Sequence, residues 1–252
     1  MDRYILPNIK QYKNIDDLFE STDKSNTTRF TDKSSFLGTI IKTHHLCIVG
    51  EPGIGKSRLL KELESTLSSK DVVKCNAVDF ISKSIGTDVK YCIVDALDEV
   101  ESNQFSRVFR EIKDFCENNK NTNVVFSCRK HYVASYARIF SSFTDLSYIE
   151  LLRLDDESVE DILSSCSEQV ICNIGKSKKM LGLLSIPRYL EYFIEYQKEN
   201  VDCQNIGQIF EQFVEKNILK AIEEYDNTQC DKNNLAILIQ RVLEKIAFVM
   251  EI

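Results

Sequence analysis

One eight-residue segment, GEPGIGKS at residues 50–57, constrains the fold of this chain more than any other feature. It directly follows the apolar run LCIV and directly precedes the helix-forming sequence RLLKEL. Glycines in such a segment allow successive backbone N–H groups to curl around a phosphate, and the N-terminus of the following helix adds a positive dipole. The pattern GxxxxGK[ST] in this setting predicts a phosphate-binding loop between a strand and a helix.

The loop side chains have separable predicted roles. We expect Lys56 to reach the β and γ phosphates of a nucleotide, and Ser57 to bind Mg²⁺. The predicted nucleotide-binding residues are those of the loop and the residue after it: Gly50, Glu51, Pro52, Gly53, Ile54, Gly55, Lys56, Ser57 and Arg58. A second GKS, at residues 175–177, has Val170 in place of the required upstream glycine and no preceding strand. We interpret that second match as incidental.

Strand-like and helix-like patterns alternate from residue 45 to residue 152. Five short runs rich in β-branched or aromatic residues lie at residues 46–49, 72–76, 91–94, 123–128 and 148–152. Helical periodicity occupies most of the sequence between them. This alternation predicts an α/β fold of the P-loop NTPase type, with a five-stranded, mostly parallel sheet covered by helices on both faces. Ligands of such sheets bind at the carboxyl ends of the strands.

The pattern also predicts a division into domains. Residues 1–44, which include the polar run STDKSNTTRFTDKSS, are expected to be an N-terminal segment and linker. Residues 45–153 carry the strand signals and form the predicted nucleotide-binding domain. Only helical periodicity follows, which indicates a helical lid subdomain over residues 154–230. Residues 231–252 are expected to begin a further helical part that the end of the sequence truncates.

A group of acidic residues follows the third predicted strand, in the segment YCIVDALDE. Asp95 ends the strand, where a carboxylate beside the phosphate loop can hold Mg²⁺ through its water shell. Asp98 and Glu99 lie close enough in sequence to orient or deprotonate an attacking water. The sequence does not distinguish between these two acids, so both are candidate catalytic residues.

Two further residues have weaker signals of their own. Arg129 follows the fourth predicted strand, where a guanidinium could sense a γ-phosphate through bidentate hydrogen bonds, although an isolated arginine at such a position is more often a solvated charge. Pro187, in the segment LLSIPRYL, reads on its own as a proline that starts a helix.

Composition excludes several other classes of protein. With 39 acidic and 32 basic residues the formal charge is −7, so no overall positive field attracts nucleic acid, and we expect no direct nucleic-acid binding. No run approaches the roughly 18 apolar residues of a membrane span, and the start lacks a signal-peptide core, which predicts a cytoplasmic protein. The nine cysteines include no CxxC pair and are expected to be free thiols. The three histidines suggest no zinc site.

The order GEPGIGKS, YCIVDALDEV, VVFSCR and LLSIPRYL resembles the NTPase core of NACHT proteins, within the STAND class of signal-transduction ATPases. The resemblance covers approximately residues 45–200, and the DALDE segment is its most specific part. It implies that Arg129 senses the γ-phosphate and that Pro187 contacts the nucleotide from the helical subdomain. It also implies a slow ATPase that binds ATP or ADP with Mg²⁺ and acts as a molecular switch controlling domain opening and self-oligomerisation. Bacterial relatives commonly act in antiviral defence, with effector and sensor parts that are expected outside this chain.

Other function classes remain open at this level. A P-loop kinase for a small molecule would carry an arginine-rich lid, and no such cluster follows the fourth strand. A GTPase would carry a DxxG segment and a guanine-reading acid, and residues 119–122, NKNT, lack that acid. An interaction module with an inactive nucleotide site is disfavoured because the key site residues are intact: Lys56, Ser57, Asp95, Asp98 and Glu99.

Overall fold

The computed structural model describes residues 5–20, 27–83, 85, 89–164 and 178–198. The described chain contains the following elements in order: β1 (Asn8–Tyr12), α1 (Ile15–Glu20), β2 (Thr27–Thr28), α2 (Lys33–Ile41), β3 (His45–Val49), α3 (Lys56–Thr66), β4 (Val72–Asn76), η2 (Ala77–Asp79), β5 (Tyr91–Asp95), η3 (Leu97–Glu99), α4 (Ser102–Asn118), β6 (Asn123–Cys128), α5 (Lys130–Ser135), α6 (Ala137–Phe140), β7 (Leu146–Leu152), α7 (Asp156–Leu163), α9 (Lys178–Leu184) and α10 (Pro187–Lys198). The chain divides into two compact units, the first comprising residues 1–155 with 186–188, and the second the remainder.

A single mixed sheet forms the centre of the first unit, with the strand order β2-β1-β7-β3-β6-β5-β4. The five strands predicted from the sequence are all present, and they pair in parallel from β7 through to β4. The predicted α/β fold is therefore confirmed. The expected strand count was wrong, because β1 and β2 extend the sheet to seven strands with antiparallel pairing.

The two unpredicted strands come from the N-terminal segment, which the sequence had suggested was largely loop. β1 pairs along its whole length with β7, from Asn8 opposite Leu152 to Tyr12 opposite Tyr148. The polar run also contains the start of α2. The Asp32 side chain caps that helix by accepting a hydrogen bond of 2.8 Å from the backbone N–H of Ser35. Short polar residues favour loops and helix N-caps alike, so composition alone could not separate the two.

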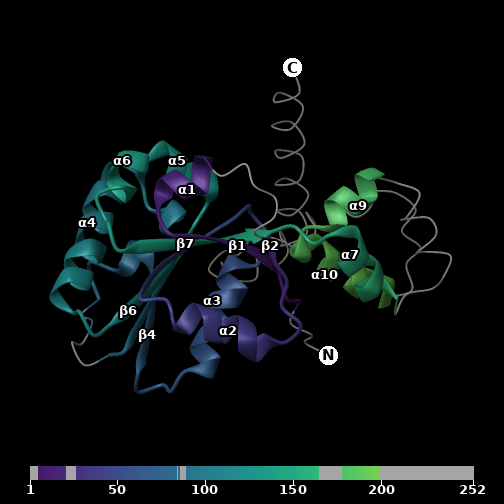
Figure 1. Ribbon diagram of the computed structural model, residues 1–252, viewed down its shortest axis with the longest axis horizontal. Helices are drawn as coiled ribbons and strands as arrows, with labels where there is room; N and C mark the ends of the chain where they lie inside the picture. Colours follow the sequence, from purple (N-terminus) through teal and green to yellow (C-terminus); the bar gives the residue numbers. More distant parts are fainter. Residues whose placement is uncertain (1–4, 21–26, 84, 86–88, 165–177, 199–252) are drawn as a thin grey trace, which may run out of the picture. The chain divides into compact units, whose positions relative to one another are not determined.

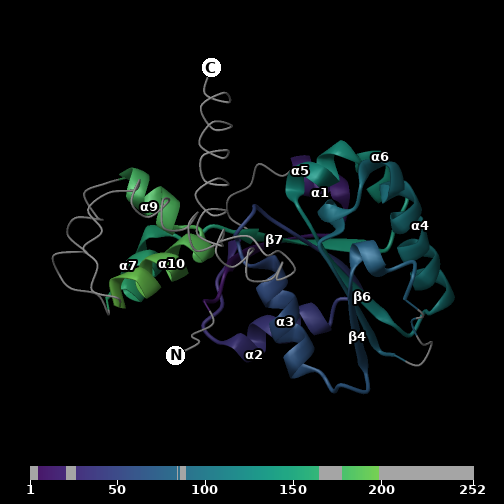
Figure 2. The ribbon, with the colours of Figure 1, turned by 180° about the vertical axis from the view of Figure 1, so that it is seen from behind.

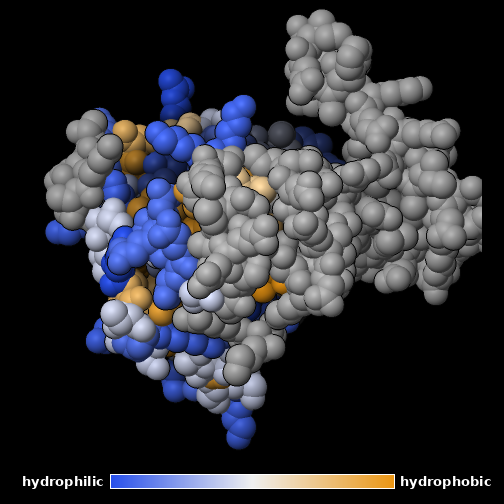
Figure 3. Space-filling model, turned by 90° about the vertical axis from the view of Figure 1, so that its right-hand side faces the viewer, coloured by the Kyte–Doolittle hydropathy of each residue, from blue (hydrophilic) through white to orange (hydrophobic). Residues whose placement is uncertain are grey.

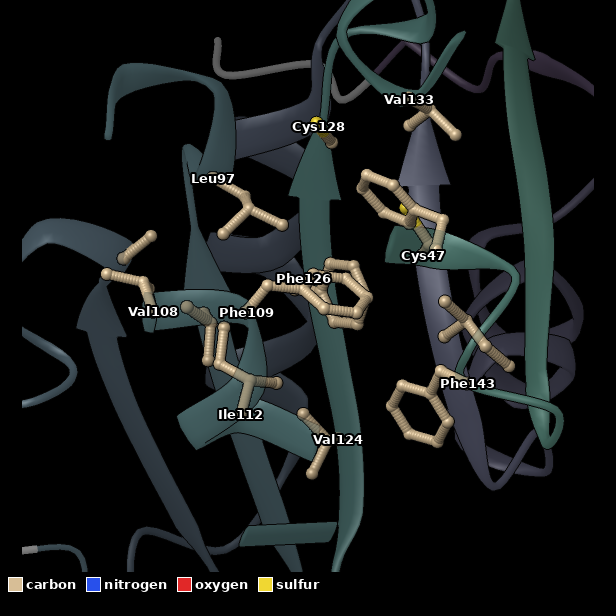
Figure 4. Close-up of a cluster of buried hydrophobic side chains, with 14 of the residues drawn as sticks. Cys47, Leu97, Val108, Phe109, Ile112, Val124, Phe126, Cys128, Val133 and Phe143 are labelled. Atoms are coloured by element: carbon tan, nitrogen blue, oxygen red, sulfur yellow. The ribbon is translucent and has the colours of Figure 1, made fainter. Parts of the chain in front are cut away.

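Helices cover both faces of the sheet (Figures 1 and 2). On one face, α1, α4, α5 and α6 pack on the inward side chains of the strands, and α4 alone contributes five buried residues. The aromatic rings of Phe109 and Phe126 meet edge to face there, with centroids 6.2 Å apart (Figure 4). On the other face, α2 and α3 bury their own apolar stripes against alternate strand residues. This two-sided burial explains why the central strands are almost wholly apolar.

The strand order decides what lies beside the phosphate loop. The loop follows β3, and β6 lies between β3 and β5. In register, Val49 at the end of β3 pairs with Cys128, and Val94 near the end of β5 pairs with Phe126. Because these strands are parallel, their carboxyl ends meet at one edge of the sheet. Residues just beyond β6 therefore lie between the loop and the acidic segment after β5.

The described part of the second unit is helical, as the periodicity after residue 154 predicts. α7 begins with Asp156 and Glu157, which favour a helix N-terminus, and α10 begins at Pro187 as expected. The part of the expected helical lid subdomain after residue 198 and the further helical part at 231–252 lie outside the described residues, as does the second GKS.

The described surface offers few exposed large apolar side chains, namely those of Phe19, Val78 and Ile81. On the face shown in Figure 3, hydrophilic residues predominate among the described atoms. No helix in the described ranges is long and apolar enough to span a bilayer.

Candidate functional site

The phosphate loop has the backbone geometry that its glycines predict. Gly53 and Gly55 adopt positive φ angles of 76° and 104°, a region that side-chain-bearing residues rarely enter. A Cβ at Gly50 would lie 2.8 Å from Cγ2 of Ile54. The side chain of Ile54 is itself buried against the α2–α3 face of the sheet, which anchors the middle of the loop. The loop is thus held in place by one buried residue and three positions that need glycine.

Lys56 is the first residue of α3, and its side chain folds back over the loop. Its Nζ donates hydrogen bonds of 2.9 Å and 3.1 Å to the carbonyl oxygens of Gly50 and Glu51. Partial burial lowers the pKa of Lys56; Arg129 also lowers it, while Asp98 opposes the shift. Asp98 and Arg129 follow the ends of β5 and β6, two strands other than the one that leads into the loop. The structure therefore brings the predicted residues into one electrostatic environment.

Asp95 is held by two serine hydroxyls. Its Oδ1 accepts a hydrogen bond of 3.1 Å from the hydroxyl of Ser57 and one of 2.6 Å from that of Ser127. The two residues that the sequence predicts as Mg²⁺ ligands are therefore hydrogen-bonded to each other. Both carboxylate and hydroxyl are hard oxygen ligands, which suits Mg²⁺. No cluster of three or more His, Cys, Asp or Glu that could hold a metal occurs among the described residues, so these oxygens together with phosphate would have to hold the ion.

Ser127 is a site residue that the sequence analysis missed. Its hydroxyl bonds to Asp95 and also accepts a hydrogen bond of 2.9 Å from the backbone N–H of Ala96. The side chain is almost completely buried, with 1% exposure. The alternation of side chains along the strand could have identified Ser127. Ser127 and Val125 lie on the same face of the sheet, so the Ser127 hydroxyl would have to enter the apolar core under α2 and α3. The sequence did not indicate that the Asp95 carboxylate would be its hydrogen-bond partner.

Ala96 marks a strained turn just after Asp95. Its φ is 58°, which makes it the one residue other than glycine with a positive φ in the described chain. The following residues form the short 3₁₀ helix η3, and the side chain of Leu97 is fully buried in the core. Such outliers persist only where neighbouring structure holds them, and here Ser127 and Leu97 do so. The turn sends Asp98 and Glu99 away from the strand direction and places them in different environments.

Asp98 and Glu99, which the sequence left as equivalent candidates, differ sharply in the structure. The Asp98 carboxylate forms an ion pair with Nε of Arg129 at 2.7 Å, and its other oxygen accepts the backbone N–H of Arg129 at 3.1 Å. Only 6% of the Asp98 side chain is exposed, compared with 42% of that of Arg129. Glu99 is exposed. The two acids therefore have separate surroundings although they are adjacent in sequence.

Residues 186–188 also lie against the loop, within the same compact unit. The backbone N–H of Arg188 donates a hydrogen bond of 3.2 Å to the carbonyl of Gly53. A Cβ added to Gly53 would lie 3.2 Å from Cγ2 of Ile186. Pro187, which lies between them in sequence, is buried. The segment that carries the predicted nucleotide-contacting proline is thus packed on the phosphate loop.

The remaining loop residues are placed at its outer edge. Glu51 and Pro52 are exposed, and Glu51 accepts hydrogen bonds of 2.9 Å and 2.6 Å from the guanidinium of Arg153. Arg58 is partly buried in the first turn of α3. An exposed pair of this kind contributes little to stability. The Glu51–Arg153 pair instead connects the loop to the end of β7, because Arg153 directly follows that strand.

The cysteines in the part of the chain that the structure describes are core residues. The five in the described ranges are buried and free, as the composition predicted: Cys47, Cys75, Cys92, Cys116 and Cys128. Burial raises the pKa of each of these thiols, so they stay protonated near neutral pH. Cys47 and Cys128 lie on the α4 side of the sheet, as Figure 4 shows, and they fill the core beneath the site.

Comparison with known proteins identifies the class of this site. The family described as Novel STAND NTPase 3 matches residues 35–168, which is more than half of the chain. The match spans the phosphate loop, the acidic segment and Arg129. It supports the STAND part of the predicted resemblance, whereas the narrower NACHT likeness stays a prediction. No curated protein matches the chain.

Solved structures with a similar fold include the replication initiator DnaA bound to AMPPCP and single-stranded DNA. It has a TM-score of 0.51 and 16% identity, and the alignment covers 81% of this chain and 72% of that chain. The Aeropyrum pernix ORC1 protein in complex with DNA has a TM-score of 0.46 and 11% identity, with coverage of 77% and 68%. A STAND protein with a tetratricopeptide repeat sensor from Pyrococcus horikoshii has a TM-score of 0.45 and 13% identity, with coverage of 79% and 35%. At such identities, the likeness to DnaA shows the fold alone.

Proposed function

The chain belongs to the Novel STAND NTPase 3 family, and we propose that it binds ATP and ADP with Mg²⁺ and hydrolyses ATP slowly, as a molecular switch. The observation that carries the proposal is the joining of three groups at one sheet edge. Lys56 closes over the loop, Ser57 and Asp95 share a hydrogen bond, and Arg129 lies beside the acidic segment. Lys56 and Ser57 follow β3, Asp95 ends β5 and Arg129 follows β6, and together they match the needs of a nucleoside triphosphate.

In this proposal the loop and Lys56 bind the phosphates. The glycine-rich backbone supplies N–H donors, and the Lys56 ammonium exchanges its bonds to loop carbonyls for bonds to the β and γ phosphates. Ser57 and Asp95 would hold Mg²⁺, which when bound neutralises phosphate charge. Ser127 keeps the Asp95 carboxylate oriented toward Ser57. The chain's own residues thus provide binding and orientation at the reacting phosphate.

Hydrolysis in this site would be an in-line displacement. A water oxygen forms a bond to the γ-phosphorus while the bond from that phosphorus to the β–γ bridging oxygen breaks. ADP leaves with the bridging oxygen and its electron pair, and the water proton passes through a carboxylate to solvent. One of the two acids after Asp95 orients the water. We propose slow turnover because a switch needs each nucleotide state to persist.

The switch part of the proposal rests on residues 186–188. Arg188 donates its backbone N–H to the Gly53 carbonyl, so a change in the loop on binding nucleotide would be transmitted to the start of α10. A ligand shifts such an equilibrium only if it binds the two arrangements with different affinity. We propose that ATP and ADP differ in this way, that ATP favours domain opening and self-oligomerisation, and that the protein acts in signalling such as antiviral defence.

Nucleotide-dependent thermal stability tests the binding step. Nucleotide at about 100 times its Kd should stabilise the folded protein by about 2.7 kcal/mol, and ATP and ADP should do so more than GTP. Lys56→Ala should abolish the shift. Lys61→Ala, an exposed change on the same helix, is the matched control and should keep it. A folded wild-type protein whose melting temperature does not respond to ATP or ADP would contradict the proposal.

Phosphate release tests the enzymatic step. The wild-type protein should release phosphate from ATP slowly and in proportion to protein concentration. Rapid transfer of the γ-phosphate to an added small-molecule acceptor would indicate a kinase instead. Light scattering of the complexes with ADP and AMPPCP tests oligomerisation, and equal mass in both would contradict that part of the proposal.

A further inference from the structure

We infer that Asp98 is a positioning residue that restrains Arg129, and that the γ-phosphate of ATP must compete with Asp98 for the same guanidinium. This inference rests on the proposed function and concerns how that site distinguishes ATP from ADP. It assigns different tasks to the two adjacent acids. Asp98 holds the sensor arginine, and Glu99 remains as the carboxylate that orients water.

The geometry of Asp98 supports the restraining role. Both of its oxygens are engaged by one residue, since Oδ2 meets Nε of Arg129 at 2.7 Å and Oδ1 accepts the Arg129 backbone N–H at 3.1 Å. The side chain is only 6% exposed. A carboxylate in this condition has little access to an attacking water. Charge-assisted contacts of this length are among the stronger ones in proteins, so the arginine is held in one orientation.

The backbone and Nε of Arg129 are held by hydrogen bonds, whereas much of its side chain is exposed. It is the N-cap residue of α5, and its backbone is fixed by the hydrogen bonds from the N–H groups of Tyr132 and Val133 to its carbonyl oxygen. Its side chain remains 42% exposed, and the ion pair is made through Nε. An anion can therefore approach the rest of the guanidinium while the backbone stays in place. This is the arrangement that a competing phosphate requires.

The pair also lies within electrostatic range of the phosphate-binding lysine. Val49 at the end of β3 pairs with Cys128 at the end of β6, so Arg129 follows β6 beside Gly50, whose carbonyl accepts a hydrogen bond of 2.9 Å from Nζ of Lys56. A γ-phosphate held by Lys56 would consequently lie near the guanidinium. ADP lacks that group, so Asp98 keeps Arg129 when ADP is bound. With ATP, the phosphate attracts Arg129 and part of the Asp98 contact must be given up.

Giving up that contact has a cost, because a buried carboxylate that loses its partner is left uncompensated. Asp98 should therefore weaken ATP binding relative to ADP binding. Asp98→Asn keeps the size of the side chain and an oxygen that can accept the Arg129 backbone N–H, and it removes the competing charge. The variant should bind the nonhydrolysable analogue AMPPCP of the order of 10-fold more tightly relative to ADP than wild type does.

The test is a calorimetric titration of the full chain with AMPPCP and with ADP, in the presence of Mg²⁺. We expect Asp98→Asn to raise the ratio of AMPPCP affinity to ADP affinity, Arg129→Ala to lower it, and Glu99→Gln to leave it unchanged. In the double variant, the Asp98→Asn effect should vanish, because the two residues act on each other. Phosphate release should be lost in Glu99→Gln and retained in Asp98→Asn.

Three results would overturn the inference. An unchanged affinity ratio in Asp98→Asn, with an unchanged melting temperature, would mean that Asp98 does not compete for Arg129. Loss of phosphate release in Asp98→Asn but not in Glu99→Gln would make Asp98 the water-orienting acid. If Asp98→Asn does not fold, Arg129→Ala provides the test. A ratio of AMPPCP affinity to ADP affinity equal to that of wild type would then show that Arg129 does not distinguish the two nucleotides, which also overturns the inference. Failure of the wild type to bind either nucleotide is a distinct outcome, which refutes the proposed function first.

Discussion

Replacing Ser127 with alanine should be among the most destabilising single changes at this site, although Ser127 belongs to none of the expected motif positions. The hydroxyl lies between two groups in a region with 1% exposure, 2.6 Å from Asp95 Oδ1 and 2.9 Å from the backbone nitrogen of Ala96. Its removal takes a charge-assisted hydrogen bond from a buried carboxylate. It also leaves the N–H of a residue with a φ of 58° without an acceptor.

The expected size follows from these two losses. A hydrogen bond to a charged group contributes about 1.5–3 kcal/mol, and an unsatisfied buried N–H costs about 1–3 kcal/mol. Since the two share one hydroxyl and are not additive, we expect Ser127→Ala to lower the free energy of unfolding by about 3 kcal/mol. Loss of the strained turn geometry should also weaken Mg²⁺-dependent nucleotide binding, because Asp95 is no longer oriented toward Ser57.

Urea denaturation followed by circular dichroism measures this change. Ser65→Ala is the matched control, since the Ser65 hydroxyl donates to a helix carbonyl at 2.8 Å on an exposed surface. The control should change the unfolding free energy by no more than about 0.5 kcal/mol. If Ser127→Ala behaves like the control, the hydroxyl does not support the site and the reasoning from burial and hydrogen bonding is refuted.

Two further predictions follow from the backbone and from a buried imidazole. Gly53→Ala should abolish nucleotide-dependent stabilisation in thermal melts, because it combines the strain of a φ of 76° with a Cβ 3.2 Å from Ile186 Cγ2, whereas Gly38→Ala, with open space around it, should not. Burial lowers the pKa of His45 to about 4, and His44 contributes to that shift. Because the folded pKa lies below the unfolded value, the contribution of His45 to stability should fall by about 3 kcal/mol as the pH drops from 6.5 to 4. His45→Phe should lessen that dependence in urea titrations at the two pH values, and an unchanged slope would contradict the assignment.

Local signals in the sequence were sufficient to predict the fold class and the strand–loop–helix geometry around residues 50–57. The local conformation of GEPGIGKS depends on its own residues. Gly53 and Gly55 permit the positive φ angles, and the helix starts directly after them at Lys56. The five central strands were equally predictable, since burial on both faces makes them continuous apolar runs. Local residues determine such features, so they can be read before any tertiary contact is known.

The edge of the sheet and the tasks of the site residues depended on contacts between distant segments. β1 has no strong pattern of its own and becomes a strand because β7, some 140 residues later, offers it a hydrogen-bonding edge. Asp98 and Glu99 are neighbours with similar chemistry, and only the position of Arg129 beyond β6 separates them. Ser127 joins the site because β6 pairs with β5 in the register that brings its hydroxyl to Asp95. Strand order and register are set by the packing of the whole sheet, so these roles were decided by the tertiary structure.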